Sequence, residues 1–274
     1  MKKSELDTVT LPDGNRLSGY RGEGIINVVH RSRMYWEQEW LERWFLPRAG
    51  DVACVYDIGA NIGNHTVYFA THSKAKVFSF EPVPVTFDLL KRNVEQNGLA
   101  DRVTLFNCAL GAQEGSARMQ VTNELSVARI TEKGTQETSI KRLDDMNLPP
   151  PDFVKIDVED YELEVLKGME RTLRESSPVL WIEIHAGLAN NTEKYELLTS
   201  LGYIPTDCVL PENIVFAKKD ANAQEKVRLL FEFITKAQTN FVQERQALTA
   251  RYTNSRSWKI TAPLRAVRSL FRRH

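Results

Sequence analysis

The sequence predicts an α/β protein with a seven-stranded, mostly parallel sheet, helices on both faces of the sheet and a C-terminal helical extension. Three observations indicate this fold. From Asp51 onward, strand-like and helix-like segments alternate, as they do in βαβ units. A turn from Gly59 to Gly63 follows the first strand-like run and precedes a helix-like segment. After Gly202, two short strand-like runs predict a hairpin inserted into the sheet.

The individual elements follow from runs of apolar residues and from Gly and Pro at their ends. Strands are expected at 52–57, 76–81, 102–108, 152–157 and 178–184, and in the hairpin at 202–205 and 213–217. Helices are expected at 64–72, 84–97, 160–174 and 190–201. The segment 112–141 is rich in Thr, Glu and Ser without a clear period, so it predicts weak edge structure or a loop over the sheet.

The chain divides into four parts. Residues 1–50 form a polar N-terminal segment with a turn at 12–15, followed by an aromatic-rich helix at 34–46 that ends at Pro47 and either packs on the core or forms part of a substrate-pocket wall. Residues 51–220 form the α/β domain. Residues 221–252 read as one long helix without Gly or Pro, which either pairs two copies as a coiled coil or docks on its own domain. Residues 253–274 form a basic amphipathic tail.

The bulk composition is that of an ordinary globular protein of 274 residues, with 42% hydrophobic and 26% charged residues. Its formal net charge of zero conceals a basic C-terminus, because seven Lys or Arg and no acid follow position 250. Three scattered cysteines, Cys54, Cys108 and Cys208, predict buried thiols in a reducing compartment. Since no signal-like or membrane-spanning apolar run is present, we expect a cytoplasmic protein.

The turn from Gly59 to Gly63 predicts a nucleotide-type cofactor site. Glu81, 22 residues after Gly59, ends the second strand, where α/β folds hold ribose hydroxyls. The turn lacks the Gly-x-Gly-x-x-Gly pattern of dinucleotide sites, which favours S-adenosylmethionine over NAD. The residues expected to bind this cofactor are Asp57, Gly59, Ala60, Asn61, Gly63 and Thr66 at the methionine end, Glu81 and Pro82 at the ribose, and Asn107 to Leu110, with Ala109, along the adenine.

Several motifs together resemble the FkbM family of S-adenosylmethionine-dependent methyltransferases. They are the run 57–66, Phe80-Glu81-Pro82, Asn107-Cys108-Ala109-Leu110-Gly111, Lys155-Ile156-Asp157-Val158-Glu159 and Leu180 to His185. The resemblance covers about residues 50–187. It implies a class I, Rossmann-like methyltransferase fold and O-methylation, often of a sugar or polyketide hydroxyl. One departure is Asp160, where the family usually has Gly after Val-Glu.

Candidate catalytic groups lie at the carboxyl ends of the fourth and fifth strands. Asp157 and Glu159 end one strand, and Glu183 and His185 end the next. A hydroxyl acceptor benefits from a base, and His185 is the first choice because the ordinary pKa of histidine is near 6.5. A divalent ion held by the Asp/Glu/His cluster is a second reading, although no firm metal-ligand spacing is present, so no metal residue is assigned.

The tail has an apolar face with Ile260, Leu264, Val267 and Phe271 and a basic face with Arg265, Arg268 and Arg272. This pattern is typical of a helix that lies on anionic lipid, where each basic group contributes roughly 1 kcal/mol. A protein groove is the second reading, and the ordered apolar face disfavours nucleic acid. The Ser-Trp-Lys-Ile-Thr-Ala-Pro-Leu-Arg run at 257–265 also resembles the tails of bacterial surface-polysaccharide enzymes.

Two classes of function therefore remain open. The first is an enzyme that methylates a sugar hydroxyl during polysaccharide or glycan assembly, peripheral on the inner face of the membrane, with methylation of another small molecule or of RNA as a variant. The second is a methyltransferase-like scaffold without catalysis, anchored to a polysaccharide-synthesising complex by the helix at 221–252 and the tail.

Overall fold

The structure is a computed structural model that describes residues 5–121, 128–131, 133–184, 191–209 and 212–219, and four isolated positions, Glu225, Arg228, Phe233 and Ile234. The expected helix at 221–252 therefore lies almost wholly outside the described residues, and the tail at 253–274 lies entirely outside them. Within the described part of the chain, no helix combines the length and the apolar character that a bilayer crossing requires.

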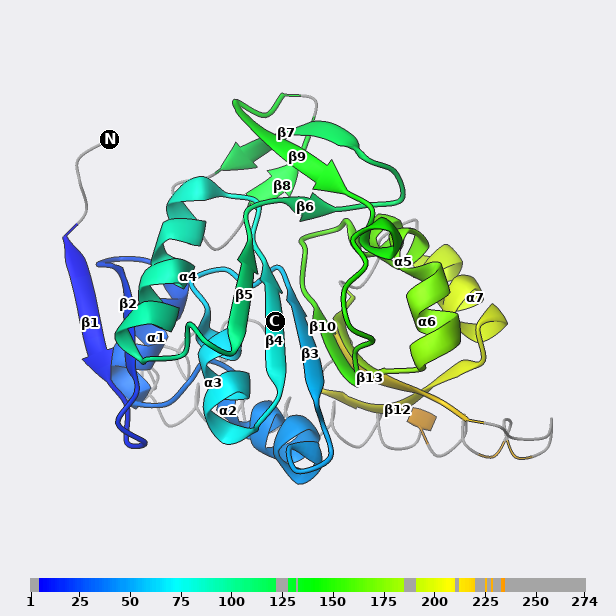
Figure 1. Ribbon diagram of the computed structural model, residues 1–274, viewed down its shortest axis with the longest axis horizontal. Helices are drawn as coiled ribbons and strands as arrows, with labels where there is room; N and C mark the ends of the chain where they lie inside the picture. The colour runs from blue at the N-terminus through cyan, green and yellow to red at the C-terminus, as the bar shows by residue number, and fades with distance from the viewer. Residues whose placement is uncertain are drawn as a thin grey trace, which may run out of the picture.

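The centre of the molecule is a seven-stranded sheet with the strand order β12-β13-β11-β10-β3-β4-β5 (Figure 1). Its strands are β3 (Cys54–Ile58), β4 (Lys76–Phe80), β5 (Val103–Phe106), β10 (Phe153–Ile156), β11 (Val179–Glu183), β12 (Tyr203–Val209) and β13 (Asn213–Lys218). The inner pairs are parallel, whereas β13 is antiparallel to both β11 and β12. The predicted sheet and its terminal hairpin are confirmed.

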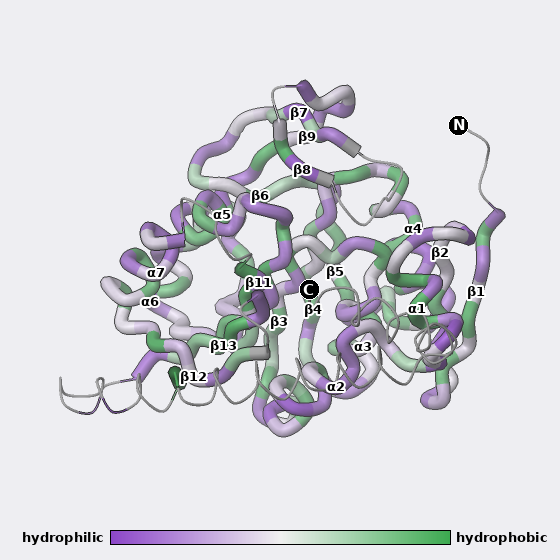
Figure 2. The backbone as a smooth tube through the Cα atoms, turned by 180° about the vertical axis from the view of Figure 1, so that it is seen from behind, coloured by the Kyte–Doolittle hydropathy of each residue, from purple (hydrophilic) through white to green (hydrophobic). Residues whose placement is uncertain are grey.

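The two faces of the sheet are covered by different parts of the chain. Side chains alternate between the faces of a strand, so Val55, Phe153 and Trp181 join one apolar core and Tyr56, Val154 and Leu180 join the other. The first core contains residues of α3 (Asn64–His72), α4 (Pro84–Gln96) and the N-terminal segment. The second contains residues of α5 (Glu162–Gly168), α6 (Glu170–Ser176) and α7 (Asn191–Ser200). Figure 2 shows the apolar colour concentrated along the central strands and mixed with polar colour in α6 and α7.

A second sheet crosses the carboxyl ends of the parallel strands. Its order is β6-β9-β7-β8, with β6 at Ala109–Leu110, β7 at Gly115–Val121, β8 at Ala128–Ile130 and β9 at Gln136–Lys141. Because β6 begins three residues after the end of β5, this sheet is held at the edge where the parallel strands end (Figure 1). The expectation of weak edge structure or a loop at 112–141 was wrong, because the segment contains β7, β8 and β9 of this sheet. Its Thr and Ser residues suit strands that have one solvated face.

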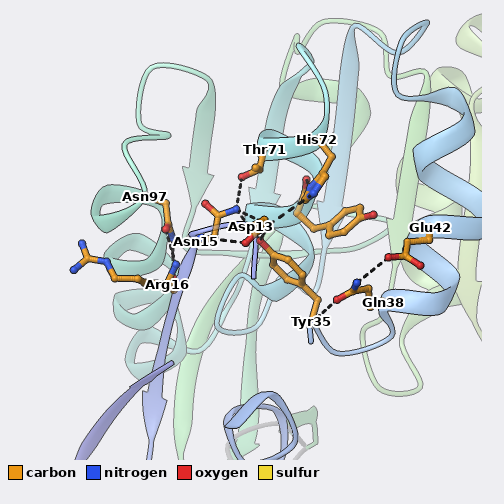
Figure 3. Close-up of polar contacts among 10 residues, drawn as sticks. Asp13, Asn15, Arg16, Tyr35, Gln38, Glu42, Thr71, His72 and Asn97 are labelled. Atoms are coloured by element: carbon orange, nitrogen blue, oxygen red, sulfur yellow. Dashed lines mark hydrogen bonds and ion pairs between the residues drawn. The ribbon is translucent and has the colours of Figure 1, made fainter. Parts of the chain in front are cut away.

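The N-terminal segment begins with a hairpin of β1 (Leu6–Thr10) and β2 (Arg16–Tyr20), whose turn contains the predicted 12–15 run. Figure 3 shows how the turn is fastened to the domain. The Tyr35 hydroxyl donates to Asp13 Oδ2 over 2.8 Å, and Asn15 Nδ2 donates to the Tyr35 hydroxyl over 2.9 Å and to Thr71 Oγ1 over 3.1 Å. These bonds fix Tyr35 against α3. They thereby also fix the backbone of the residues directly after Tyr35.

The structure corrects the expected helix at 34–46. The chain instead forms α2 (Gln38–Trp40), a π-helical turn η1 (Leu41–Phe45) and a 3-10 turn η2 (Leu46–Arg48) that contains Pro47. A helix cannot extend back to residue 34, because Glu37 has a left-handed φ of 59°. The wide turn of η1 directs Leu41, Trp44 and Phe45 into the core.

Two further helices differ from the expectation. The sequence analysis did not predict α1 (Gly24–Ser32), a short helix that buries Ile26 and Val29. The single helix expected at 160–174 is divided at Met169 into α5 and α6. The Glu162 carboxylate of α5 and the Lys194 ammonium of α7 form an ion pair of 2.6 Å with both side chains at most 1% exposed, which ties these two helices together.

Candidate active site

A cavity of about 330 Å³ opens at the carboxyl ends of β3, β4, β10 and β11. Its wall combines the Gly-rich turn, the end of β4, the second sheet and the N-terminal segment. The predicted residues that line it are Gly59, Ala60, Asn61, Glu81, Pro82, Cys108, Ala109, Leu110, Asp157, Glu159 and Glu183. The wall also contains Trp36, which belongs to the aromatic segment considered for the pocket wall, and Glu37, Asn64, His65 and Tyr161, to which the sequence analysis gave no role. One cavity thus joins the predicted cofactor residues to predicted catalytic ones.

The Gly-rich turn is held in place by its own hydrogen bonds. The amides of Gly59 and Ala60 donate to the Phe80 carbonyl over 3.0 and 2.9 Å, and the Gly63 amide donates to the Ala60 carbonyl over 2.8 Å. The Asn61 amide donates to Glu81 Oε2 over 2.9 Å. The turn amides therefore have internal acceptors, whereas the N-terminus of α3 directly behind the turn has no side-chain cap. An anionic ligand group would bind at that helix start rather than on the turn itself.

Glu81 occupies the position predicted for a ribose-binding acid. Its side chain is in the cavity wall, it is 5% exposed, and its Oε1 also accepts the Val83 amide over 2.9 Å. Burial raises the pKa of Glu81 to about 7, and the two backbone hydrogen bonds only partly offset this rise. Each carboxylate oxygen can still accept a second donor. Hydroxyl donors from a ligand would therefore favour the ionised carboxylate.

Four predicted cofactor residues support the site from behind and do not line the cavity. Asp57 is fully buried, its Oδ2 accepts the Thr66 hydroxyl over 2.6 Å, and its Oδ1 has no hydrogen-bond partner among the described residues. Gly63 precedes α3 and packs against Leu90. Asn107 donates from Nδ2 to the Glu81 carbonyl over 2.8 Å. Together they fix the turn and the end of β4.

The other half of the cavity contains a cluster of ionisable groups on one face of the sheet. Lys155 Nζ lies 2.6 Å from Asp157 Oδ2, and the Glu183 carboxyl hydrogen-bonds to Asp157. Burial alone would raise the pKa of Asp157, but the Lys155 ammonium and the bond from Glu183 hold that pKa below its usual range. Burial and the Asp157 charge raise the pKa of Glu183 well above its usual range. Asp157 is therefore a charged acceptor, and Glu183 is a protonated donor.

Glu159 and Asp160 connect the cavity rim to the second sheet. Arg129 of β8 lies 3.3 Å from Glu159 Oε2 through Nη2 and 3.3 Å from Asp160 Oδ2 through Nη1. The two acids have left-handed φ values of 52° and 76°. This backbone conformation explains why the family pattern has Gly at position 160. Here the Asp160 amide donates to Glu162 Oε1 over 3.0 Å, which supports the turn without a Gly.

His185, the residue first chosen as base, lies outside the described residues. Among the described residues, no group of three or more His, Cys, Asp or Glu is arranged to hold a metal ion. The three cysteines are buried and form no disulfide, as predicted, and burial raises the pKa of Cys54 to about 12 and of Cys108 to about 11.

A Gly-rich turn after β3, an acid at the end of β4 and an antiparallel β13 within a parallel sheet define a class I methyltransferase fold. The chain belongs to the FkbM family of methyltransferases: the family model described as the Methyltransferase FkbM domain matches residues 57–205. The resemblance of the sequence to this family is confirmed, and the protein is a methyltransferase of the FkbM type.

Individual relatives share part of this chain. The hexuronic acid methyltransferase AglP of Haloferax volcanii is 33% identical over 63% of this chain and 74% of its own length. The methyltransferase sdnD of Sordaria araneosa is 28% identical over 42% of this chain and 60% of its own length. A crystal structure of the methyltransferase FkbM from Methylobacillus flagellatus is 20% identical, with a TM-score of 0.49 over 68% of this chain and 47% of that chain.

Proposed function

We propose that this protein transfers the methyl group of S-adenosylmethionine to a hydroxyl of a sugar during surface polysaccharide or glycan assembly. One observation carries the proposal: a single cavity has Glu81 and the Gly-rich turn on one side and Asp157 and Glu183 on the other, with Lys155 paired to Asp157 from behind the wall. A cofactor and a polar acceptor can therefore meet in it. The cluster also favours an enzyme over a scaffold, because ionisable groups with shifted pKa values that line a cavity gather at functional sites.

The cavity wall suits S-adenosylmethionine. The uncapped start of α3 fits the methionine carboxylate, the Asp157 carboxylate fits the methionine amine, and Glu81 fits the ribose hydroxyls. Phe80, Cys108 and Leu110 give an apolar wall for the adenine. When bound, this cofactor supplies an electrophilic methyl group on a sulfonium. The protein then has to hold the acceptor oxygen in line with that group and accept a proton.

The sugar acceptor is supported by the AglP relative, whose name gives a hexuronic acid as the group methylated. The test is methyl transfer from labelled S-adenosylmethionine to UDP-glucuronic acid and to UDP-glucose, with calorimetric titration of cofactor binding in parallel. Transfer to either sugar supports the proposal. Cofactor binding without transfer to any sugar or lipid-linked glycan would count against a sugar as the acceptor. If the folded protein does not bind the cofactor, the hypothesis of a non-catalytic scaffold remains.

Replacing Glu81 with Ala should weaken the binding of S-adenosylmethionine and S-adenosylhomocysteine by about 1–3 kcal/mol, since ribose hydroxyls lose their acceptor. Wild-type affinity should also fall as the pH is lowered through about 7, because protonation removes the charged form that accepts two hydroxyls. In Glu81→Ala this pH dependence should disappear. Isothermal titration between pH 6 and 8.5 measures both effects.

Asp88→Ala is the matched control for Glu81→Ala, because Asp88 is an exposed acid on the neighbouring helix α4. Its affinity and its pH dependence should equal those of the wild type. If Glu81→Ala binds the cofactor as the wild type does, the ribose is held elsewhere.

The C-terminal segments complete the proposal. The tail at 253–274 would hold the enzyme at an anionic membrane surface or at a polysaccharide-assembly protein, and the helix at 221–252 would join two copies. Deletion of 253–274 should reduce co-sedimentation with vesicles of phosphatidylglycerol. The binding free energy should weaken by roughly 1 kcal/mol for each basic group that contacts the surface. Vesicles of phosphatidylcholine serve as the control. Unchanged binding to the anionic vesicles would exclude the membrane reading.

A further inference from the structure

A histidine and a glutamate from distant parts of the chain meet in the cavity wall. His65 Nε2 of α3 lies 3.2 Å from Glu37 Oε2, and the two side chains are 8% and 14% exposed. Both residues line the cavity that also contains Asp157 and Glu183. The sequence analysis quoted His65 as part of a motif and gave Glu37 no role, because 27 residues separate them in the chain.

Residues of two separate elements, α3 and β13, position Glu37. Asn64 hydrogen-bonds both to the Trp36 amide over 2.9 Å and to the Trp36 carbonyl over 3.0 Å, which fixes the backbone next to Glu37. Asn213 of β13 donates from Nδ2 to Glu37 Oε1 over 3.2 Å, and its own Oδ1 accepts the Trp181 indole N–H over 2.7 Å. The left-handed φ of Glu37 is a strained conformation that this network maintains.

The His65 ring is equally well fixed, but Nε2 is left without a hydrogen bond. The ring packs edge-on against Trp181 with centroids 5.4 Å apart. Glu37 Oε2 is 3.2 Å away as an ion-pair partner, but Nε2 is a buried polar atom with no hydrogen-bond partner among the described residues. His65 is 6% exposed and faces the cavity. A buried polar atom of this kind is normally satisfied, so Nε2 is suited to a ligand hydroxyl.

The neighbouring acids are poor alternatives as proton acceptors. Asp157 is paired with Lys155 over 2.6 Å, which makes its carboxylate a weak base. Glu183 is already protonated, since burial and the Asp157 charge raise its pKa. Glu159 lies at the rim against Arg129. Within the described part of the cavity, His65 is the imidazole of the wall, and in the neutral tautomer that carries its proton on Nδ1 the Nε2 atom has a lone pair to accept a proton.

We propose that His65 Nε2 accepts the proton of the acceptor hydroxyl, and that Glu37 stabilises the imidazolium that forms; this inference rests on the proposed function. The hydroxyl oxygen forms a bond to the methyl carbon, and the electron pair of the carbon–sulfur bond remains on sulfur. The hydroxyl proton passes to Nε2 and from there to solvent when product leaves. His65 is thus a catalytic residue, and Glu37 is a positioning residue that acts through it.

Kinetics of methyl transfer to UDP-glucuronic acid or UDP-glucose test the pair. His65→Asn should lower kcat by about 100-fold or more, the usual contribution of a general base, while the dissociation constant for S-adenosylhomocysteine stays within a few-fold of the wild type. Glu37→Gln should lower kcat less, with KM unchanged, and Glu37→Asp should recover part of the loss because it restores the charge. His72→Asn on the same helix is the control, since His72 stacks on Tyr68 away from the cavity. A kcat for His65→Asn within a few-fold of the wild type would overturn the proposal.

A second measurement needs no acceptor and so separates this proposal from the proposed function. Diethyl pyrocarbonate acylates unprotonated imidazole nitrogens, and peptide mass spectrometry locates the modified residue. His65 in the folded wild type should react through the cavity, and His30, whose side chain is 53% exposed, is the internal reference. Should neither sugar be methylated, reaction at His65 still supports a free Nε2 in the cavity. If His30 reacts and His65 does not, Nε2 is closed to ligands and the proposal fails.

Discussion

Replacing Gly59 with Ala is expected to destabilise the protein and to abolish cofactor binding. A Cβ at this position would lie 1.7 Å from the Asp157 carbonyl oxygen and 2.7 Å from its carbonyl carbon, and Gly59 has a φ of +81°. The left-handed conformation and the overpacking should together cost about 2–5 kcal/mol of unfolding free energy. Since the clash is with backbone, β10 must move at its carboxyl end and carry Asp157 with it. Urea unfolding and titration with S-adenosylmethionine measure the two effects.

Gly98→Ala separates the two causes. Gly98 also has a left-handed φ, of +66°, but no atom lies within 4 Å of a Cβ placed there. This variant should lose only about 1 kcal/mol, and it should bind the cofactor normally. Equal losses in the two variants would mean that the turn adapts to the new methyl group, and that the close approach of Gly59 to Asp157 is not needed for the site.

The cofactor half of the cavity could be predicted from the sequence because its signals are local. The turn after β3 and the acid that ends β4 lie on consecutive elements, and parallel strands bring their carboxyl ends to one edge. Strand alternation likewise placed Asp157 and Glu183 at that edge. The sequence also indicated the hairpin of β12 and β13, since Gly202 and the two apolar runs lie close together.

The half of the cavity that contains Glu37 and His65 could not be predicted in the same way. Glu37 reaches the cavity only because Asn15, Tyr35 and Asn64 fasten the N-terminal segment to α3, and such long-range contacts leave no periodic signal. The π-helical turn at Leu41–Phe45 has the apolar spacing of an ordinary helix. His65 did carry a signal, since it follows Gly63 by two residues at the start of a helix, but the position alone gives no partner.

Replacing Lys155 with Met is expected to lower the free energy of unfolding by about 3 kcal/mol at neutral pH. The Lys155 side chain is 1% exposed, and its removal leaves the Asp157 carboxylate without its cation. Removing one partner of a buried ion pair usually costs about 3–5 kcal/mol. The lower end of this range applies here, because the Asp157 side chain is 30% exposed. In the wild type, the lowered pKa of Asp157 means that the pair stabilises the fold above the unfolded pKa, near 4, and that this stability is lost as the pH falls further.

In Lys155→Met the shift of the Asp157 pKa is reversed, because a buried carboxyl without a cation has a pKa above its unfolded value. Ionised Asp157 then destabilises the fold. The difference in stability from the wild type should therefore be largest near pH 7 and shrink as the pH falls toward 4, as urea unfolding at several pH values would show. Lys194→Met is the control: it breaks the buried pair with Glu162 outside the cavity, so it should destabilise the fold without weakening cofactor binding. Adding Asp157→Asn to Lys155→Met should restore part of the stability. A loss that is constant with pH would instead assign the role of Lys155 to its packing over Trp181, whose ring centroid lies 5.4 Å from Nζ.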